Sequence, residues 1–222
     1  MFQKITTEEL LGSLNEFEQV KLPQELYYAG RLILARKTPR IAIVGSRAAS
    51  PAGLELATKL AEHVVSVSGV VVSGLAKGID RAAHEGALEA GGGTIAVLGT
   101  PLDHFYPAEH RSLQERLMRE QLVLSQFAPG SPVHRSNFVT RNRTMALVSH
   151  ATVIVEASEK SGTQSQAWEA IRLGRGLYIP QALAEADFEW PRKLLQYGAI
   201  TFSSLEDLLQ DPLINPEVEL VW

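Results

Sequence analysis

Three short runs of small residues, each following a stretch of apolar residues, are the segments of this chain most suited to hold an anion. They are Gly45-Ser46-Arg47, the run from Ser73 to Asp80 (SGLAKGID), and Gly99-Thr100-Pro101. Glycine lets a backbone approach a ligand closely, and the free N–H groups at the start of a following helix attract phosphate. A tight turn between a strand and a helix needs glycine in any case, but three such turns in register favour a phosphate-binding rim.

Residues 128–149 (APGSPVHRSNFVTRNRTMALVS) are predicted to form a long polar loop that runs into Arg141-Asn142-Arg143. Arginine binds phosphate through two parallel hydrogen bonds, and its plane stacks on nucleobases. Arg47 and the two arginines of this segment could therefore hold a sugar–phosphate chain. Phe138, just before them, and Tyr106 in the preceding loop are candidate platforms for stacked bases.

A structural role is the alternative for the same arginines, which would then cap helix ends or pair with Glu156 or Asp80. These acids, with Asp103 and Glu169, could form a catalytic carboxylate pair only if the fold brought them together. Helix caps and ion pairs are their expected roles. The sequence alone leaves the choice between a phosphate-binding and a structural role of the arginines open.

The patterns of common phosphate-binding enzymes are absent. No GxGxxG follows the first apolar run and GxxxxGK[ST] does not occur, which argues against a dinucleotide cofactor and against phosphoryl transfer. The six histidines lack metal-ligand spacing, and without cysteine there is neither a disulfide nor a thiolate site. Ser46 and Ser73 lie outside a GxSxG context. We expect no catalytic residue, no metal and no cofactor.

The composition indicates one main globular domain: 222 residues, of which 45% are hydrophobic, suffice for one large core. The formal net charge of −4 argues against binding nucleic acid with the whole surface, so any DNA contact must be a local patch. The first residues do not resemble a signal sequence, and no apolar run approaches the roughly 20 residues of a membrane helix. We therefore expect no membrane contact and a cytoplasmic protein.

The elements that would position these residues follow from the hydrophobic pattern. Seven nearly continuous apolar runs are typical of strands buried on both faces of a parallel sheet: residues 40–45, 70–74, 94–99, 122–127, 151–157, 176–180 and 199–202. Between them, one predicted helix has Ser50 as N-cap and Pro51 at its first position, and another has Asp80 as cap. The alternation predicts a doubly wound, mostly parallel, Rossmann-like α/β sheet whose ligands bind beyond the carboxyl ends of the strands.

Three regions are expected along the chain. Residues 1–39 contain two helix-like pieces, TTEELLGSLNEF and LPQELYYAGRLILA, and no convincing strand, which predicts a small helical N-terminal cap on the sheet. Residues 40–210 form the Rossmann-like core. Residues 211–222 form a C-terminal tail, whose ending NPEVELVW could be an irregular tail or an edge strand.

Read together, five segments occur in the order typical of DprA (Smf) DNA-processing proteins: IAIVGSR, SGLAKGIDRAAHEGALEAGGGTIAVLGTPLDHFYP, NFVTRNR, VIVEASEKSG and LGRGLYIP. The chain resembles this family over roughly residues 22 to 209. The resemblance implies an extended Rossmann fold, a homodimer, and binding of single-stranded DNA in a basic pocket beside the sheet. It also implies that RecA recombinase is loaded onto that DNA during natural transformation and recombination. The winged-helix-like domain that many members carry is not expected here.

The resemblance also suggests a set of site residues. Arg47, Lys77, Arg141 and Arg143 match positions expected to face the DNA, while glycines and serines of the three turns would shape the pocket. With the stacking groups inferred above, the predicted DNA- and phosphate-binding residues are Gly45, Ser46, Arg47, Ser73, Gly74, Lys77, Gly78, Tyr106, Phe138, Arg141, Asn142, Arg143, Ser161, Gly162 and Thr163.

The chain departs from the family pattern in two functional segments. After Tyr106-Pro107, the usual lysine is replaced by Ala108-Glu109, and the segment usually read as SGSLITA is here SGTQSQA (161–167). A second hypothesis is therefore a LOG-like nucleotide-binding sensor or nucleoside-monophosphate hydrolase. Gly162-Thr163 with Glu169 is a loose counterpart of the PGGxGTxxE motif of such enzymes.

Overall fold

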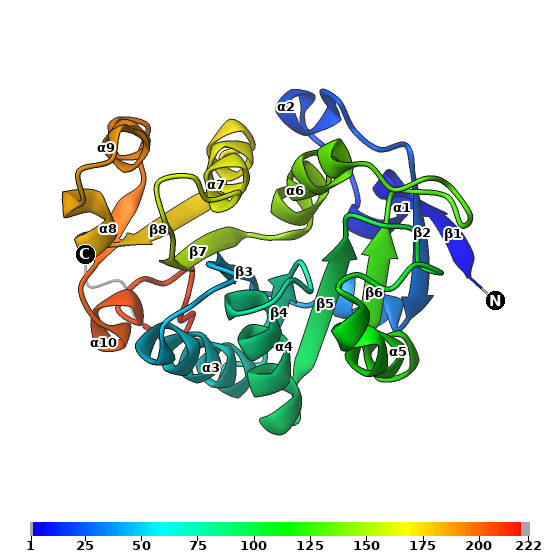
Figure 1. The fold of residues 1–222 in the computed structure, drawn as a ribbon, viewed down its shortest axis with the longest axis horizontal. Helices are drawn as coiled ribbons and strands as arrows, with labels where there is room; N and C mark the ends of the chain where they lie inside the picture. Colours follow the sequence, from blue (N-terminus) through cyan, green and yellow to red (C-terminus); the bar gives the residue numbers. More distant parts are fainter. Residues whose placement is uncertain (1, 219–222) are drawn as a thin grey trace.

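A nine-stranded sheet covered by helices on both faces forms the centre of the computed structural model, which describes residues 2–218 (Figure 1). The strand order is β1-β2-β6-β5-β4-β3-β7-β8-β9. The strands are β1 (Gln3–Thr6), β2 (Glu25–Gly30), β3 (Arg40–Gly45), β4 (Val70–Ser73), β5 (Gly93–Leu98), β6 (Leu122–Ser125), β7 (Ala151–Glu156), β8 (Gly176–Pro180) and β9 (Ile200–Phe202). Strands β3 to β9 are parallel to one another, whereas β2 is antiparallel to both β6 and β1. The predicted doubly wound fold is confirmed.

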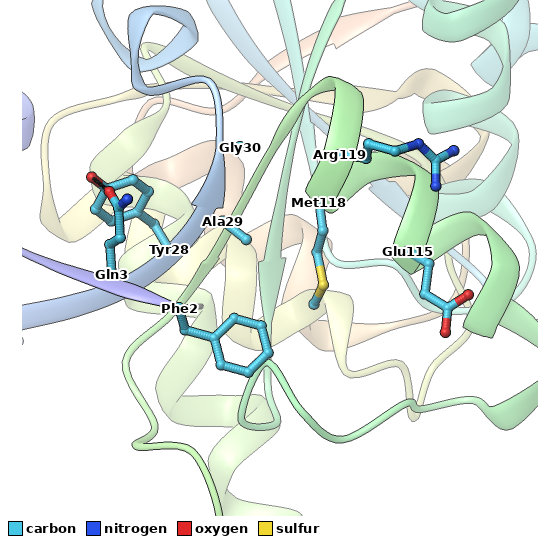
Figure 2. Close-up of a pocket in the computed structure, with 8 residues that line it drawn as sticks. All are labelled: Phe2, Gln3, Tyr28, Ala29, Gly30, Glu115, Met118 and Arg119. Carbon is cyan, nitrogen blue, oxygen red and sulfur yellow. Dashed lines mark hydrogen bonds between the residues drawn. The ribbon is translucent and has the colours of Figure 1, made fainter.

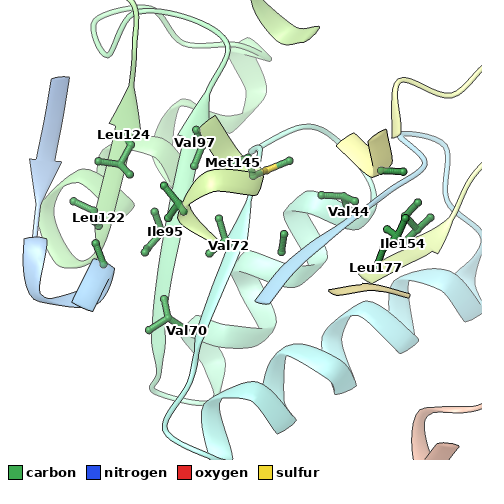
Figure 3. Packing of buried hydrophobic residues seen from close by; sticks show 14 of the residues in the cluster. Val44, Val70, Val72, Ile95, Val97, Leu122, Leu124, Met145, Ile154 and Leu177 are labelled. Carbon is green, nitrogen blue, oxygen red and sulfur yellow. The ribbon is translucent and has the colours of Figure 1, made fainter. Parts of the chain in front are cut away.

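The parallel strands β3 to β8 are buried on both faces, as their apolar runs predicted, whereas the edge strand β9 leaves Ile200 and Thr201 exposed. In β3, Ile41 and Ile43 pack on one face while Ala42 and Val44 pack on the other. Successive side chains of a strand point to opposite faces, so a strand covered on both sides needs apolar residues throughout. Figure 3 shows the cluster that contains Val44, with Met145 reaching it from a helix.

Helices cover both faces of the sheet. On the face of Val44 lie α1 (Thr7–Leu11), α6 (Arg135–Val148), α7 (Thr163–Arg172), α8 (Gln181–Glu185) and α9 (Glu189–Gln196), with α2 (Glu16–Gln19) outside them (Figure 1). On the face of Ile43 lie α3 (Pro51–Ser66), α4 (Ile79–Glu89), α5 (Arg111–Glu120) and α10 (Leu205–Leu208). Two 3₁₀ turns, η1 (Leu32–Arg36) and η2 (Ala108–His110), complete the fold. No helix within residues 2–218 has the length and apolar character needed to cross a membrane.

One of the two predicted helix starts is confirmed and the other is wrong. The Ser50 side chain accepts a hydrogen bond from the N–H of Gly53, and Pro51 opens α3. Helix α4, however, begins after Gly78, and Asp80 does not cap it. The Asp80 carboxylate instead accepts hydrogen bonds from the N–H groups of Gly74 and Ala76, at 3.2 and 3.3 Å. Asp80 thus fixes the loop before the helix rather than the helix itself.

The N-terminal segment contains two strands, so the expectation that it has none is wrong. Residues 25–30, predicted as helix, form β2, because hydrogen bonding to β6 outweighs a local pattern that also fits a helix. Strand β1 pairs with β2 and extends the sheet further. At the other end, residues 215–218 form no strand, and residues 219–222 of the predicted tail or edge strand lie outside the described residues.

A fully buried histidine makes the fold sensitive to acid. His84 lies on α4 with its Nδ1 2.7 Å from the Thr94 hydroxyl, and burial, together with His110 and Arg141, lowers its pKa to about 3. In the unfolded chain the same pKa is about 6.5. Below pH 6.5 the unfolded state therefore binds a proton that the folded state excludes, and stability falls as the pH drops toward 3.

His84→Gln keeps a polar group near Thr94 but cannot titrate. We expect it to reduce the slope of the free energy of unfolding against pH by up to about 1.4 kcal/mol per pH unit. Urea unfolding of the wild type and the variant at pH 7.5 and 5.5 measures it. Some acid sensitivity should remain, since burial also lowers the pKa of His150 to about 4. Equal loss of stability in both proteins would contradict the assignment to His84.

Candidate nucleic-acid interface

A small pocket lies beyond the carboxyl ends of the central strands. Its walls come from the loops after β3, β4 and β5 and from helix α6. It is lined by Arg47, Gly74, Ala76, Lys77, Tyr106, Pro107, Phe138 and Arg141. Its volume of about 60 Å³ admits one small group, so a longer ligand would lie along the rim. Six of the residues that the sequence singled out thus meet at one place, where a doubly wound sheet commonly binds its ligand.

Arg141 provides a fixed positive charge in the pocket. Its Nη1 donates a hydrogen bond of 2.6 Å to the carbonyl of Val97 in β5, and the side chain is only 6% exposed. Burial lowers the pKa of Arg141 while nearby Asp80 raises it, and an arginine remains protonated at neutral pH in either case. Gly74 makes the room: a Cβ at that position would collide with the Arg141 guanidinium.

The loops after β3 and β4 are held against each other beside the pocket. The N–H of Ile79 donates to the carbonyl of Ser46 at 3.2 Å, and the N–H of Ser46 donates to the backbone carbonyl of Glu156 at 2.8 Å. Gly78 has a φ of 70°, and a Cβ there would meet the Ser46 carbonyl. These contacts fix the turn that carries Arg47, whose own side chain is exposed.

Lys77 lines the pocket but is already paired. Its Nζ lies 2.8 Å from a carboxylate oxygen of Glu109 in η2, and both side chains are about half exposed. The hydrogen bond from Lys77 lowers the pKa of Glu109, so this carboxylate is ionised at neutral pH. Glu109 belongs to the Ala108-Glu109 segment, in which the resemblance leads us to expect a cation.

The two candidate stacking residues are in contact. The ring centroids of Tyr106 and Phe138 are 5.1 Å apart with an interplanar angle of 53°. Tyr106 is 47% exposed, whereas Phe138 is partly buried against Gly99, where a Cβ would lie 2.5 Å from the ring. The pair therefore presents an aromatic surface beside the cations, suited to stacking on a base.

The structure does not bring Arg143 or Asn142 to the pocket. The predicted loop is helix α6 from Arg135 onward, and residues two apart on a helix face different sides. Arg143 points away from the pocket, with Nη1 2.9 Å from Glu169 of α7 and Nη2 2.8 Å from the carbonyl of Phe17. Arg143 thus joins α6 to α7 and to the N-terminal segment.

We expect Arg143→Ala to destabilise the fold without weakening ligand binding in the pocket. Removing its two charge-assisted hydrogen bonds should cost about 1.5 to 3 kcal/mol in the free energy of unfolding, measured by urea denaturation. Arg172→Ala is the matched control, because Arg172 pairs with the same Glu169 but is 60% exposed. Its loss should cost less than about 1 kcal/mol. Equal effects of the two variants would contradict the structural role of Arg143.

The remaining predicted residues shape loops rather than line the pocket. Ser73 is buried, and its hydroxyl donates to the carbonyl of Ile43 at 2.7 Å. The segment from Ser161 to Thr163 starts α7, with the two hydroxyl oxygens 2.6 Å apart. A larger residue does not fit at Gly45, because a Cβ there would lie 2.6 Å from the Ile79 side chain.

Glu156, for which the sequence predicted a helix cap or an ion pair, occupies the start of α3. Its carboxylate accepts hydrogen bonds from the N–H of Ser50, at 3.1 Å, and from the Ser50 hydroxyl, at 2.6 Å. Gly53 leaves room for it, because a Cβ there would lie 2.6 Å from the same oxygen. Between β3 and β7, where the strand order reverses, the helix N-terminus that often receives phosphate in such folds thus holds an internal carboxylate.

A larger, open groove of about 370 Å³ lies at the edge of the sheet formed by β1 and β2, between these strands and α5 (Figure 2). Phe2 and Met118 face each other across it, and Tyr28 is hydrogen-bonded to Gln3 at one end. None of the predicted site residues lines this groove. Among the described residues, no group of three or more His, Asp or Glu side chains is arranged to hold a metal ion.

Comparison with known proteins links the chain to one family. The family model for DNA recombination-mediator protein A matches residues 9–212. The DNA processing protein DprA of Streptococcus pneumoniae is 36% identical over 95% of this chain and 75% of its own length. That of Bacillus subtilis is 32% identical over 85% of this chain and 64% of its own length. The chain thus spans only part of these relatives.

Solved structures give the same result. The structure of S. pneumoniae DprA superimposes with a TM-score of 0.78, at 33% identity, over 95% of this chain and 74% of that one. A DprA structure from Helicobacter pylori, which concerns the way that protein binds single-stranded DNA, has a TM-score of 0.78, 26% identity, and coverage of 95% and 94%. The molybdenum cofactor carrier protein of Chlamydomonas reinhardtii, at 19% identity and a TM-score of 0.54, shares the fold.

Proposed function

Because the chain belongs to the DNA recombination-mediator protein A family, we propose that its pocket binds single-stranded DNA and that the protein passes this DNA to a RecA-type recombinase. The observation that carries the proposal is the convergence of Arg47, Lys77 and Arg141 with the Tyr106–Phe138 pair. Cations beside an aromatic platform are the recurrent means of binding a single strand. The H. pylori relative, described as a single-stranded DNA binder, supports the same ligand.

The geometry suggests how a strand would lie. One phosphate enters the small pocket toward Arg141, and a neighbouring phosphate meets Arg47 on the rim. A base then stacks on Tyr106, which every base can do because each has a π-face. Sequence preference should therefore be weak, as a protein that protects incoming DNA of any sequence during transformation requires.

We further propose that the site binds DNA without altering it. The hydrolase hypothesis needs Glu169 as a free acid near Gly162-Thr163. Its two carboxylate oxygens instead lie 2.9 Å from Arg143 and 2.6 Å from Arg172. The phosphate position at the start of α3 also contains Glu156. Both observations favour a binding protein over a nucleotide hydrolase or a nucleotide sensor.

Fluorescence anisotropy of labelled oligo-dT across a salt series tests the proposal. We expect micromolar or tighter binding by the wild type. Arg47→Ala should bind more weakly and reduce the slope of log K against log salt by about 0.7, the value for one phosphate contact to a single strand. Arg36→Ala is the matched control, because Arg36 is exposed in η1, near the opposite end of the strands. Absence of wild-type binding at low salt would overturn the proposal.

The partner proposals need separate measurements. If the protein delivers DNA to a recombinase, it should raise the rate at which a RecA-type recombinase assembles on oligo-dT, and Arg47→Ala should lower that gain. The proposed homodimer is tested by sedimentation of the protein alone, where a purely monomeric species at all concentrations would contradict it. Localisation in the cytoplasm, where this DNA is handled, belongs to the same proposal.

A further inference from the structure

The Lys77–Glu109 ion pair stands at the mouth of the pocket. Lys77 comes from the loop between β4 and α4, and Glu109 comes from η2, directly after the pocket residue Pro107. The Nζ and carboxylate oxygen are 2.8 Å apart, and the side chains are 52% and 54% exposed. The ammonium that should face DNA is therefore bound to a carboxylate, which carries the same sign of charge as a phosphate.

We propose that Glu109 competes with the phosphates of single-stranded DNA for Lys77, so that Lys77 contacts DNA only after Glu109 has moved away. The proposal rests on the proposed function of the pocket. It divides the cations into two permanent ones, Arg47 and Arg141, and one that is released on binding. Glu109 then lowers the affinity of the pocket for any polyanion.

The surroundings permit this exchange. An ion pair between half-exposed side chains is weak, because water solvates both partners after they separate. Glu109 also has a second positive charge nearby, since Arg81 lowers its pKa as well. Arg81 is itself bound to Glu85 at 2.9 Å, so it is a shared partner for a displaced Glu109 carboxylate rather than a replacement for Lys77.

Glu109→Gln removes the charge and keeps the shape of the side chain. At about 0.15 M salt, where charges beyond roughly 8 Å are screened, we expect this variant to bind oligo-dT about two- to fivefold more tightly than the wild type. The control for net charge is Glu55→Gln, whose carboxylate pairs with Lys59 at 2.7 Å on α3 with similar exposure. It should leave the affinity unchanged.

The double variant separates competition from a general effect of charge. If Glu109 acts through Lys77, the gain from Glu109→Gln disappears when Lys77→Gln is also present. The competition is overturned if the gain in affinity persists in the double variant. It is also overturned if the wild type binds DNA and Glu109→Gln binds it no more tightly. Failure of both the wild type and Glu109→Gln to bind would instead overturn the proposed function. If the wild type binds at low salt but only Glu109→Gln still binds at about 0.15 M salt, the competition is supported in its strongest form.

Discussion

Arg141→Gln should weaken the binding of oligo-dT by about 10- to 100-fold, the largest effect expected of any single cation in the pocket. Hydrogen bonds to a charged group contribute about 1.5 to 3 kcal/mol, and each 1.4 kcal/mol is a factor of ten in affinity. Arg141 is preorganised, because the bond to Val97 and the contact with Gly74 already hold the guanidinium in place. Ordering it on binding therefore costs little conformational entropy.

A loss of folding has to be separated from a loss of binding in this variant. Glutamine keeps a donor that can serve the Val97 carbonyl, but removing a buried charge leaves Asp80 without its compensating partner. The urea midpoint of Arg141→Gln should therefore be measured beside its affinity. Gly74→Ala provides a second route, because it displaces the guanidinium while the charge stays in the protein. Full DNA affinity in a folded Gly74→Ala variant would show that this position of Arg141 is irrelevant.

Tyr106→Ala should weaken oligo-dT binding by about 5- to 100-fold and leave the salt slope unchanged. Stacking of one base on an aromatic side chain is worth about 1 to 3 kcal/mol, and it displaces no counterion. Tyr106→Phe should retain most of the affinity, because the ring and not the hydroxyl supplies the surface. Tyr197→Ala, just after the end of α9, removes a 64% exposed tyrosine that contacts Trp168 and is the matched control.

The two predictions differ in their dependence on salt. The arginine variant should lose affinity with a shallower salt slope, whereas the tyrosine variant should lose affinity in parallel with the wild type. A tyrosine variant that binds normally would remove the stacking platform from the proposal but leave the phosphate contacts. A changed slope in Tyr106→Ala would mean that its loss alters the position of the cations.

The parallel sheet could be predicted from the sequence because burial on both faces leaves a local signature. Each of the strands β3 to β8 carries apolar residues in succession, a pattern that few other environments require. The loops after β3 and β4 were also predictable, since glycines between an apolar run and a predicted helix indicate where the chain turns. The sequence thus placed Arg47, Gly74 and Lys77 at the same edge of the sheet.

Helix α6 could not be predicted in the same way. It is packed against the sheet on one side and against α7 on another, and it buries polar residues such as Asn137 and Thr144 among apolar ones. Its sequence therefore lacks the polar and apolar stripes of a surface helix. Once the segment is helical, its geometry separates Arg141 from Arg143, which a loop would have allowed to act together.

The interaction of Lys77 with Glu109 could not be predicted from the sequence either, although the unexpected acid after Tyr106-Pro107 could be recognised there. The two residues are 32 positions apart, and only the packing of η2 beside the loop after β4 shows that they meet. Likewise, Glu156 follows an apolar run as an ordinary strand end would, and nothing local indicates that it binds the start of α3.

The pairing of β2 with β6 constrains the order in which the sheet can form during translation. Tyr27 lies opposite Ser125, so partners in one ladder are separated by nearly 100 residues of chain. At a synthesis rate of about 5 to 20 residues per second, roughly 5 to 20 seconds pass between the translation of one strand and that of the other. During that interval the β2 backbone cannot form its hydrogen bonds to β6. The first strands to leave the ribosome are thus the ones that must wait to join the sheet.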